Sequence, residues 1–203
     1  MGAVRFIVCF AAGIAAAHAA GGAVLSSGDL AAMEGKYGAH RQIDGAGGWT
    51  ADFQQEVQSP DLAQPITSRG KLDFAAPDGL TLTYVEPVAG QVAMIHGKFQ
   101  QAFPGRKVEA SSAELLQSLL QFFHLPPQAW RTQFAITGTA NEGLLKIELA
   151  AKPGAATTQP ATIEEVIDLT TLDPVSLIIR FSNHTSLEFS FSNWQRTQEK
   201  PKA

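Results

Sequence analysis

The most constraining feature of this sequence is the alternation of apolar and polar residues along many short segments. In SRGKLDFAAPDGLTLTYVEP (68–87), Leu72 and Phe74 alternate with Lys71 and Asp73, and the second half of the segment repeats the pattern. Alternation with a period of two is typical of an antiparallel β-sheet with one apolar and one polar face. The apolar face of such a sheet must be covered, either by other parts of the chain or by a bound molecule.

The same alternation recurs along the chain and predicts about ten strands in all. Turn residues separate most of them, as at His96-Gly97 and in SNHTS at 182–186. After the last strand, the polar residues 195–203 predict a tail. The predicted strands lie at 49–57, twice within 68–87, twice within 89–105, and at 130–137, 142–152, 163–169, 175–183 and 186–194.

One segment, 112–124, predicts a strong helix. Ser111 and Glu114 have the spacing of a capping box, and two prolines after the segment prevent its continuation. A weaker helical pattern runs from 23 to 38, where three glycines dilute it. The apolar residues of the strong helix cover more than half of its circumference, so it must lie on a sheet or over a cavity. They are Leu115, Leu116, Leu119, Leu120, Phe122 and Phe123.

These elements fit two architectures. In a closed sandwich, two sheets would cover each other's apolar faces. In the other, a single antiparallel sheet is strongly curved and incompletely closed, a half-barrel lidded by α-helices, and its apolar face encloses a cavity. No repeat or composition shift marks a boundary, so a mainly β single domain is predicted, with connecting loops at 45–48 and 153–162.

The start of the chain predicts a cleavable export signal at 1–19. Arg5 precedes an apolar run that is too short to span a bilayer, and Ala17 to Ala19 fit a small-x-small cleavage site. The mature chain, 20–203, then contains no cysteine, because Cys9 lies within the signal. We therefore expect an exported protein of the periplasm.

The charge balance argues against nucleic acid as a partner. The chain has 15 basic and 19 acidic side chains, which gives a formal net charge of −4. A modestly acidic protein is a poor match for a polyanion.

No sequence motif points to catalysis, a metal or a cofactor. G-x-S-x-G, H-E-x-x-H, a P-loop and G-x-G-x-x-G are all absent from the sequence. The histidines are isolated at predicted turns or helix ends, and Glu164 and Glu165, being adjacent, would point to opposite faces of a strand. We expect a protein that is not an enzyme, with a hydrolase assembled from distant positions as a less favoured alternative.

Four segments resemble, in order and spacing, the periplasmic outer-membrane lipoprotein carriers of the LolA family. WTADFQQEV (49–57) resembles the family's first strand. SRGKLDF, followed by Pro77, another strand and Pro87, resembles its next hairpin. IHGKFQQAF (95–103) resembles the following turn, and TSLEFSFSNWQ (185–195) resembles the final strand.

The resemblance implies a curved, open half-barrel whose interior receives acyl chains under a helical lid. It implies an acylated cargo, either a lipoprotein or a glycolipid, an inner-membrane exporter, an outer-membrane receptor and a monomeric carrier. Where the family typically has an arginine that helps to hold the lid, this chain has Ala76. LAQPITSRGKLDF (62–74) more closely resembles relatives linked to glycolipid or aryl-polyene export, so we expect a carrier of an acylated molecule.

The predicted lipid-binding residues are the large apolar side chains on the alternating strands and on the lid helix. The other interpretation of each is an ordinary core residue, as in an envelope scaffold or assembly protein that has a filled core and binds partners at a sheet edge. The candidates are Phe53, Leu72, Phe74, Leu80, Leu82, Tyr84, Met94, Phe103, Leu116, Leu119, Leu120, Phe123, Phe181, Phe189 and Phe191.

Overall fold

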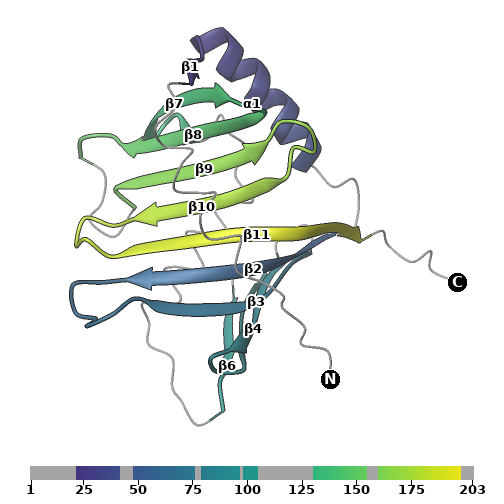
Figure 1. The fold of residues 1–203 in the computed structure, drawn as a ribbon, viewed down its shortest axis with the longest axis vertical. Coiled ribbons are helices and arrows are strands. Elements are labelled where there is room, and N and C mark those ends of the chain that lie inside the picture. Colours follow the sequence, from purple (N-terminus) through teal and green to yellow (C-terminus); the bar gives the residue numbers. More distant parts are fainter. Residues whose placement is uncertain are drawn as a thin grey trace, which may run out of the picture.

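A computed structural model of the chain describes residues 22–41, 48–75, 79–96, 98–104, 130–154 and 160–197. These residues form eleven antiparallel strands and the helix α1 (Figure 1). The elements are β1 (Ala23–Val24), α1 (Ser27–Arg41), β2 (Gly48–Gln58), β3 (Ile66–Ala75), β4 (Gly79–Glu86), β5 (Gly90–Ile95), β6 (Lys98–Ala102), β7 (Phe134–Asn141), β8 (Leu144–Ala151), β9 (Thr162–Asp168), β10 (Pro174–Arg180) and β11 (Ser186–Thr197).

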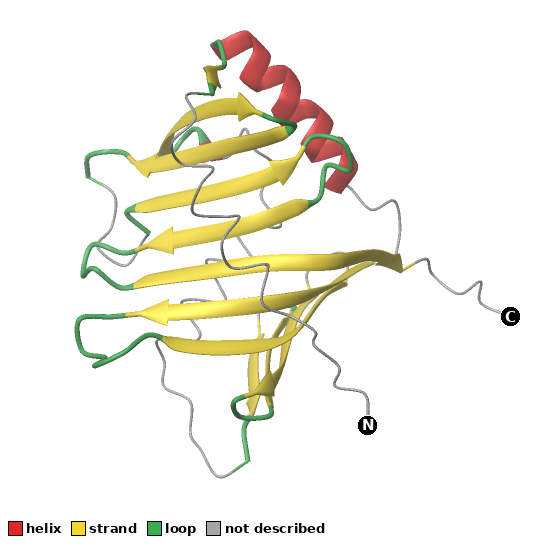
Figure 2. Cartoon of the chain, in the orientation of Figure 1, coloured by secondary structure: helices red, strands yellow, loops and turns green. Residues whose placement is uncertain are grey.

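All eleven strands belong to one sheet, in the order β1-β7-β8-β9-β10-β11-β2-β3-β4-β5-β6. The two end strands, β1 and β6, do not pair with each other, so the sheet is open. It is also curved, because β4 and β6 run at a steep angle to β11 (Figures 1 and 2). The predicted curved, incompletely closed antiparallel sheet is confirmed. The two-sheet sandwich is wrong for the part of the chain that the structure describes.

One face of the sheet, called the inner face here, carries the buried apolar side chains. Alternation places them there: Leu72 of β3 lies opposite Leu82 of β4, and Phe74 lies opposite Leu80. Lys71 and Asp73, on the other side of β3, are exposed. The predicted lid helix at 112–124 and Ala76 lie outside the described residues.

The helix α1 closes the inner face at the β7 end of the sheet. Its start is capped, because the Ser26 hydroxyl accepts a hydrogen bond from the backbone N–H of Asp29 at 3.2 Å. Leu30, which is buried, packs over Gly138 of β7, where an added Cβ would lie 2.7 Å from the Leu30 Cδ1. The helical pattern predicted at 23–38 is thus confirmed from Ser27 onward. Its first residues instead form β1, a strand too short for alternation to reveal.

Both boundaries of the strand predicted at 130–137 differ in the structure. The strand predicted at 130–137 begins only at Phe134, because the segment before it turns: the backbone N–H of Gln133 donates to the Trp130 carbonyl at 2.9 Å. The strand then continues through Gly138 to Asn141, where Glu142 and Gly143 form the turn. Both turn residues have positive φ (49° and 79°), as a type I′ hairpin turn requires.

The last strand is longer than predicted. The register of β11 against β2 shifts between Ser192 and Gln195, and Asn193 in this bulge has φ 55°. Beyond the bulge, pairing resumes and continues to Thr197, opposite Gly48. The tail predicted at 195–203 is therefore wrong for its first three residues, since their backbone groups complete the ladder with β2.

The turn between β9 and β10 is held by a carboxylate. Asp168 accepts hydrogen bonds from the backbone N–H groups of Thr170 (2.6 Å) and Thr171 (3.2 Å). These bonds favour the charged form and lower the pKa of Asp168 below its ordinary value. The side chain thus fixes the turn of the β9–β10 hairpin.

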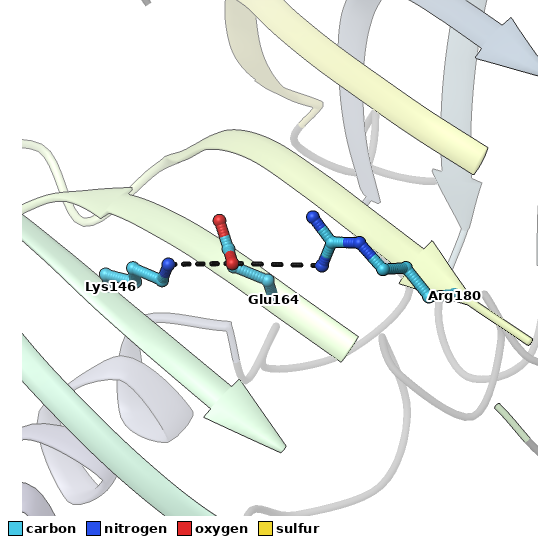
Figure 3. A network of polar contacts seen from close by, with 3 residues as sticks. All are labelled: Lys146, Glu164 and Arg180. Atoms are coloured by element: carbon cyan, nitrogen blue, oxygen red, sulfur yellow. Dashed lines mark ion pairs between the residues drawn. The ribbon is translucent and has the colours of Figure 1, made fainter. Parts of the chain in front are cut away.

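A charged group sits on the outer face of β8 to β10 (Figure 3). The Glu164 side chain, only 7% exposed, lies 2.7 Å from the Lys146 Nζ and 3.9 Å from the Arg180 Nη1. Both distances end on the same carboxylate oxygen, Oε2. Because a buried carboxylate is costly without a cation beside it, the closer Lys146 should carry most of the stabilisation.

Replacing Lys146 with methionine is expected to lower the free energy of unfolding by about 1.5–3 kcal/mol, the usual range for a hydrogen bond to a charged group. Methionine keeps the apolar stem, so the change isolates the charge. The matched variant Arg180→Met, at 3.9 Å and more exposed, should cost less than about 1 kcal/mol. Urea unfolding measures both. A larger loss in Arg180→Met would contradict this ranking.

Candidate functional site

Every predicted lipid-binding residue within the described ranges lies on or against the inner face. Most are buried, and Leu82 and Phe189 have no exposed surface (0%). Tyr84, Phe103 and Phe181 are partly buried and pack against the same cluster. That these residues bind lipid stays a prediction. The described members of this set are Phe53, Leu72, Phe74, Leu80, Leu82, Tyr84, Met94, Phe103, Phe181, Phe189 and Phe191; Leu116, Leu119, Leu120 and Phe123 lie outside the described residues.

An unbroken row of aromatic rings runs along the inner face from the residue after β6, through β4 and β2, to β11, and returns through β2 to β3. Neighbouring ring centroids are 5.3 to 6.3 Å apart, within the range of favourable aromatic contacts. We call this set the aromatic row. In order of contact it consists of Phe103, Tyr84, Phe53, Phe189, Phe191, Trp194, Trp49 and Phe74.

The bulge in β11 completes this row. In regular alternation, Trp194 would point to the opposite face from Phe191. The extra residue reverses the alternation, so that the Trp194 ring lies 5.5 Å from Phe191 and 6.3 Å from Trp49. Its indole N–H donates to the Pro174 carbonyl at 2.7 Å, which gives the polar end of the ring a partner.

Two glycines make room for rings around Tyr84. Gly70 of β3 and Gly90 of β5 lie opposite Tyr84 on either side of it. A Cβ at Gly70 would lie 2.8 Å from the Phe53 ring and overlap the Thr83 carbonyl oxygen, and a Cβ at Gly90 would overlap the Phe103 ring. The rings of Phe53 and Phe103 therefore lie over glycines, with Tyr84 between them.

A polar pair interrupts the apolar surface at the same place. Gln55, at an inner position of β2 and only 3% exposed, hydrogen-bonds with the Tyr84 hydroxyl. Burial raises the pKa of Tyr84 above its ordinary value, and the bond with Gln55 acts in the opposite direction. The hydroxyl is therefore neutral at physiological pH and can donate a hydrogen bond.

The other half of the inner face, on β7 to β10, is mainly aliphatic, and among its described residues is one carboxyl group. Glu165 lies opposite Ile147 of β8 and Leu177 of β10, and none of its surface is exposed (0%). Glu164 next to it lies on the outer face, so the prediction that the two point to opposite faces is confirmed. The alternation does not predict that both are buried.

Some of these features have a signal in the sequence and others do not. Gln55 is a polar residue at an apolar position of a clear alternation, and such an exception is a visible signal of a special environment. Trp194 has none, because its position depends on the bulge. Gly70 and Gly90, small residues within strands, are the type of residue that marks a close approach.

The inner face combines apolar contact with the Gln55–Tyr84 pair and the buried carboxyl group of Glu165. His96 and His184 are exposed and have the positive φ of turn residues (52° and 64°). Within the described ranges, His, Cys, Asp and Glu side chains form no cluster that could hold a metal ion. The described inner face is mainly apolar.

Comparisons with known proteins give structural matches alone. No protein-family model matches the chain, and no curated protein matches its sequence. The structure is similar to that of the Pseudomonas aeruginosa MucA/MucB complex (10% identity, TM-score 0.46), with 82% of this chain matched and 56% of the other. This chain therefore spans less than two thirds of that one.

Two further matches cover almost the whole of the other chain. One is a LolA superfamily protein from Nitrosomonas europaea (7% identity, TM-score 0.38, 84% of this chain and 94% of the other). The other is an outer membrane lipoprotein-sorting protein domain from Vibrio parahaemolyticus (8% identity, TM-score 0.38, 81% and 91%). Among the described residues, no helix is both long and apolar enough to cross a membrane.

Proposed function

We propose that this chain is a periplasmic carrier that binds the acyl chains of a lipoprotein or another lipid on its inner face and takes them towards the outer membrane. The observation that carries the proposal is the inner face itself. It is apolar across a single open sheet, and no second sheet of described residues faces it. The aromatic row supplies large apolar surfaces along this face.

The physical need for such a carrier follows from the cost of exposing hydrocarbon to water. Burial contributes about 0.8 kcal/mol per CH₂, so a chain of roughly sixteen carbons is stabilised by on the order of 12 kcal/mol. A lipid with that penalty does not cross an aqueous compartment unaided. Binding and release need no covalent step, only an acceptor with an apolar site of its own.

The remaining parts of the proposal rest on the sequence. Residues 1–19 are removed on export, and 20–203 form one carrier domain that acts as a monomer in the periplasm. An inner-membrane exporter supplies the cargo and an outer-membrane receptor accepts it. The cargo is an acylated molecule, for which a glycolipid and a lipoprotein are both candidates.

A second candidate function is an envelope scaffold or assembly protein. Two observations favour it: Leu72, Leu80 and other inner residues are almost fully buried, as in a filled core, and β6 is an end strand of the sheet. Apart from Phe99, the residues of β6 are exposed. An end strand of this kind can pair with an extended segment of a partner.

Titration of the purified mature chain with a fluorescent fatty acid separates the two candidates. A carrier should bind the probe saturably and release it to competing phospholipid. A scaffold should show no saturable binding of the probe and should instead form crosslinks to an envelope protein through β6. Absence of saturable binding, with crosslinks from Lys98, would overturn the carrier in favour of the scaffold.

A further inference from the structure

Gln55 and Tyr84 form a polar pair beside the aromatic row: Gln55 is only 3% exposed at an inner position of β2, and its side chain pairs with the Tyr84 hydroxyl. The Gln55 amide carries N–H donors, and a phenol oxygen can accept one hydrogen bond while its own O–H donates another. With the Gln55 N–H donating to the Tyr84 oxygen, the Tyr84 proton is available to an acceptor on a ligand.

The surroundings hold this hydroxyl in place. The Phe53 and Phe103 rings lie 5.3 and 5.8 Å from the Tyr84 ring, and each lies over a glycine next to it. With rings on both sides and Gln55 on its oxygen, Tyr84 has little freedom to turn. A donor fixed in this way, within an apolar surface, suits a ligand with one acceptor on an otherwise apolar chain.

Acylated molecules have such an acceptor. The carbonyl group of an ester or amide joins the hydrocarbon chain to the rest of the molecule, and its oxygen accepts hydrogen bonds but donates none. We infer that the Tyr84 hydroxyl, oriented by Gln55, donates a hydrogen bond to the carbonyl oxygen of an ester- or amide-linked acyl chain bound on the inner face. This subsite rests on the proposed carrier function and deepens it, since it selects acyl over plain alkyl chains.

The test compares two ligands that differ only at the carbonyl, methyl palmitate and methyl hexadecyl ether. Each displaces a fluorescent fatty acid from the mature wild-type chain and from Tyr84→Phe, which keeps the ring. The variant should bind the ester about three- to tenfold more weakly, the usual effect of one hydrogen bond. Its affinity for the ether should not change.

A second variant and a second readout distinguish the loss of the hydrogen bond from a change in packing caused by the substitution. Gln55→Leu, which removes the orienting amide, should also weaken binding of the ester more than of the ether. With methyl palmitate carrying ¹³C at its carbonyl, the infrared band of the bound ester should lie at a lower frequency in the wild type than in Tyr84→Phe. This band reports the hydrogen bond directly.

The outcomes are distinct. If Tyr84→Phe weakens both ligands equally, or neither, and the infrared band does not move, the subsite is wrong while the carrier function stands. If the wild-type chain binds neither ligand nor the fluorescent probe, the carrier function itself fails, and the subsite fails with it.

Discussion

Replacing Leu82 with aspartate is expected to unfold the protein, with a loss of more than about 4 kcal/mol in the free energy of unfolding. Leu82 has no exposed surface (0%) and lies between Leu72 of β3 and Val92 of β5 on the inner face. A carboxylate there would lose its hydration and gain no cation. Urea unfolding followed by circular dichroism measures the change.

The control for this variant is Thr83→Asp, one residue further along β4. Thr83 lies on the outer face, opposite Lys71 and Gln91, so an added carboxylate stays hydrated and faces a cation. Its stability should stay within about 0.5 kcal/mol of the wild type. Equal losses in the two variants would show that the inner and outer faces of β4 are wrongly assigned.

Replacing Gly70 with alanine is the second change with a large expected effect, a loss of about 1–3 kcal/mol or more. The added Cβ would overlap the backbone oxygen of Thr83 and approach the Phe53 ring at 2.8 Å. Backbone cannot move aside as a flexible side chain can, so β3 and β4 must separate locally. The thermal midpoint should fall accordingly.

A glycine-to-alanine substitution in α1 should instead raise the free energy of unfolding. Gly35 is exposed, and an added Cβ there would have nothing within 4 Å. Alanine has the higher helix propensity, so Gly35→Ala should stabilise the chain by up to about 1 kcal/mol. A Gly70→Ala variant as stable as Gly35→Ala would refute the close approach described for β3 and β4.

The sheet is predictable because one physical constraint, the burial of one face, acts on every second residue of each strand. Alternation alone assigns Leu72, Phe74, Leu80 and Leu82 to a common face, and the strand register agrees. The order of the strands is not predictable in this way, since alternation says nothing of which strand pairs with which. The open curvature of the sheet is predicted instead from the sequence resemblance to LolA-like carriers.

The features that escape prediction arise from single residues in special backbone or packing environments. The bulge at Asn193 changes the face of Trp194, and nothing in the alternation marks it. The burial of Glu164 depends on cations brought near by neighbouring strands. Alternation likewise cannot tell a residue that lines a ligand site from one in a filled core, so Phe189 fits both interpretations.

Native mass spectrometry of the mature chain, purified from a bacterial host without detergent, tests acyl binding on the inner face most directly. If the inner face holds acyl chains, the spectrum should contain a population heavier than the polypeptide by the mass of a fatty acid or phospholipid, which solvent extraction then identifies. A spectrum of empty protein alone, unchanged after incubation with phospholipid vesicles, would contradict the carrier function.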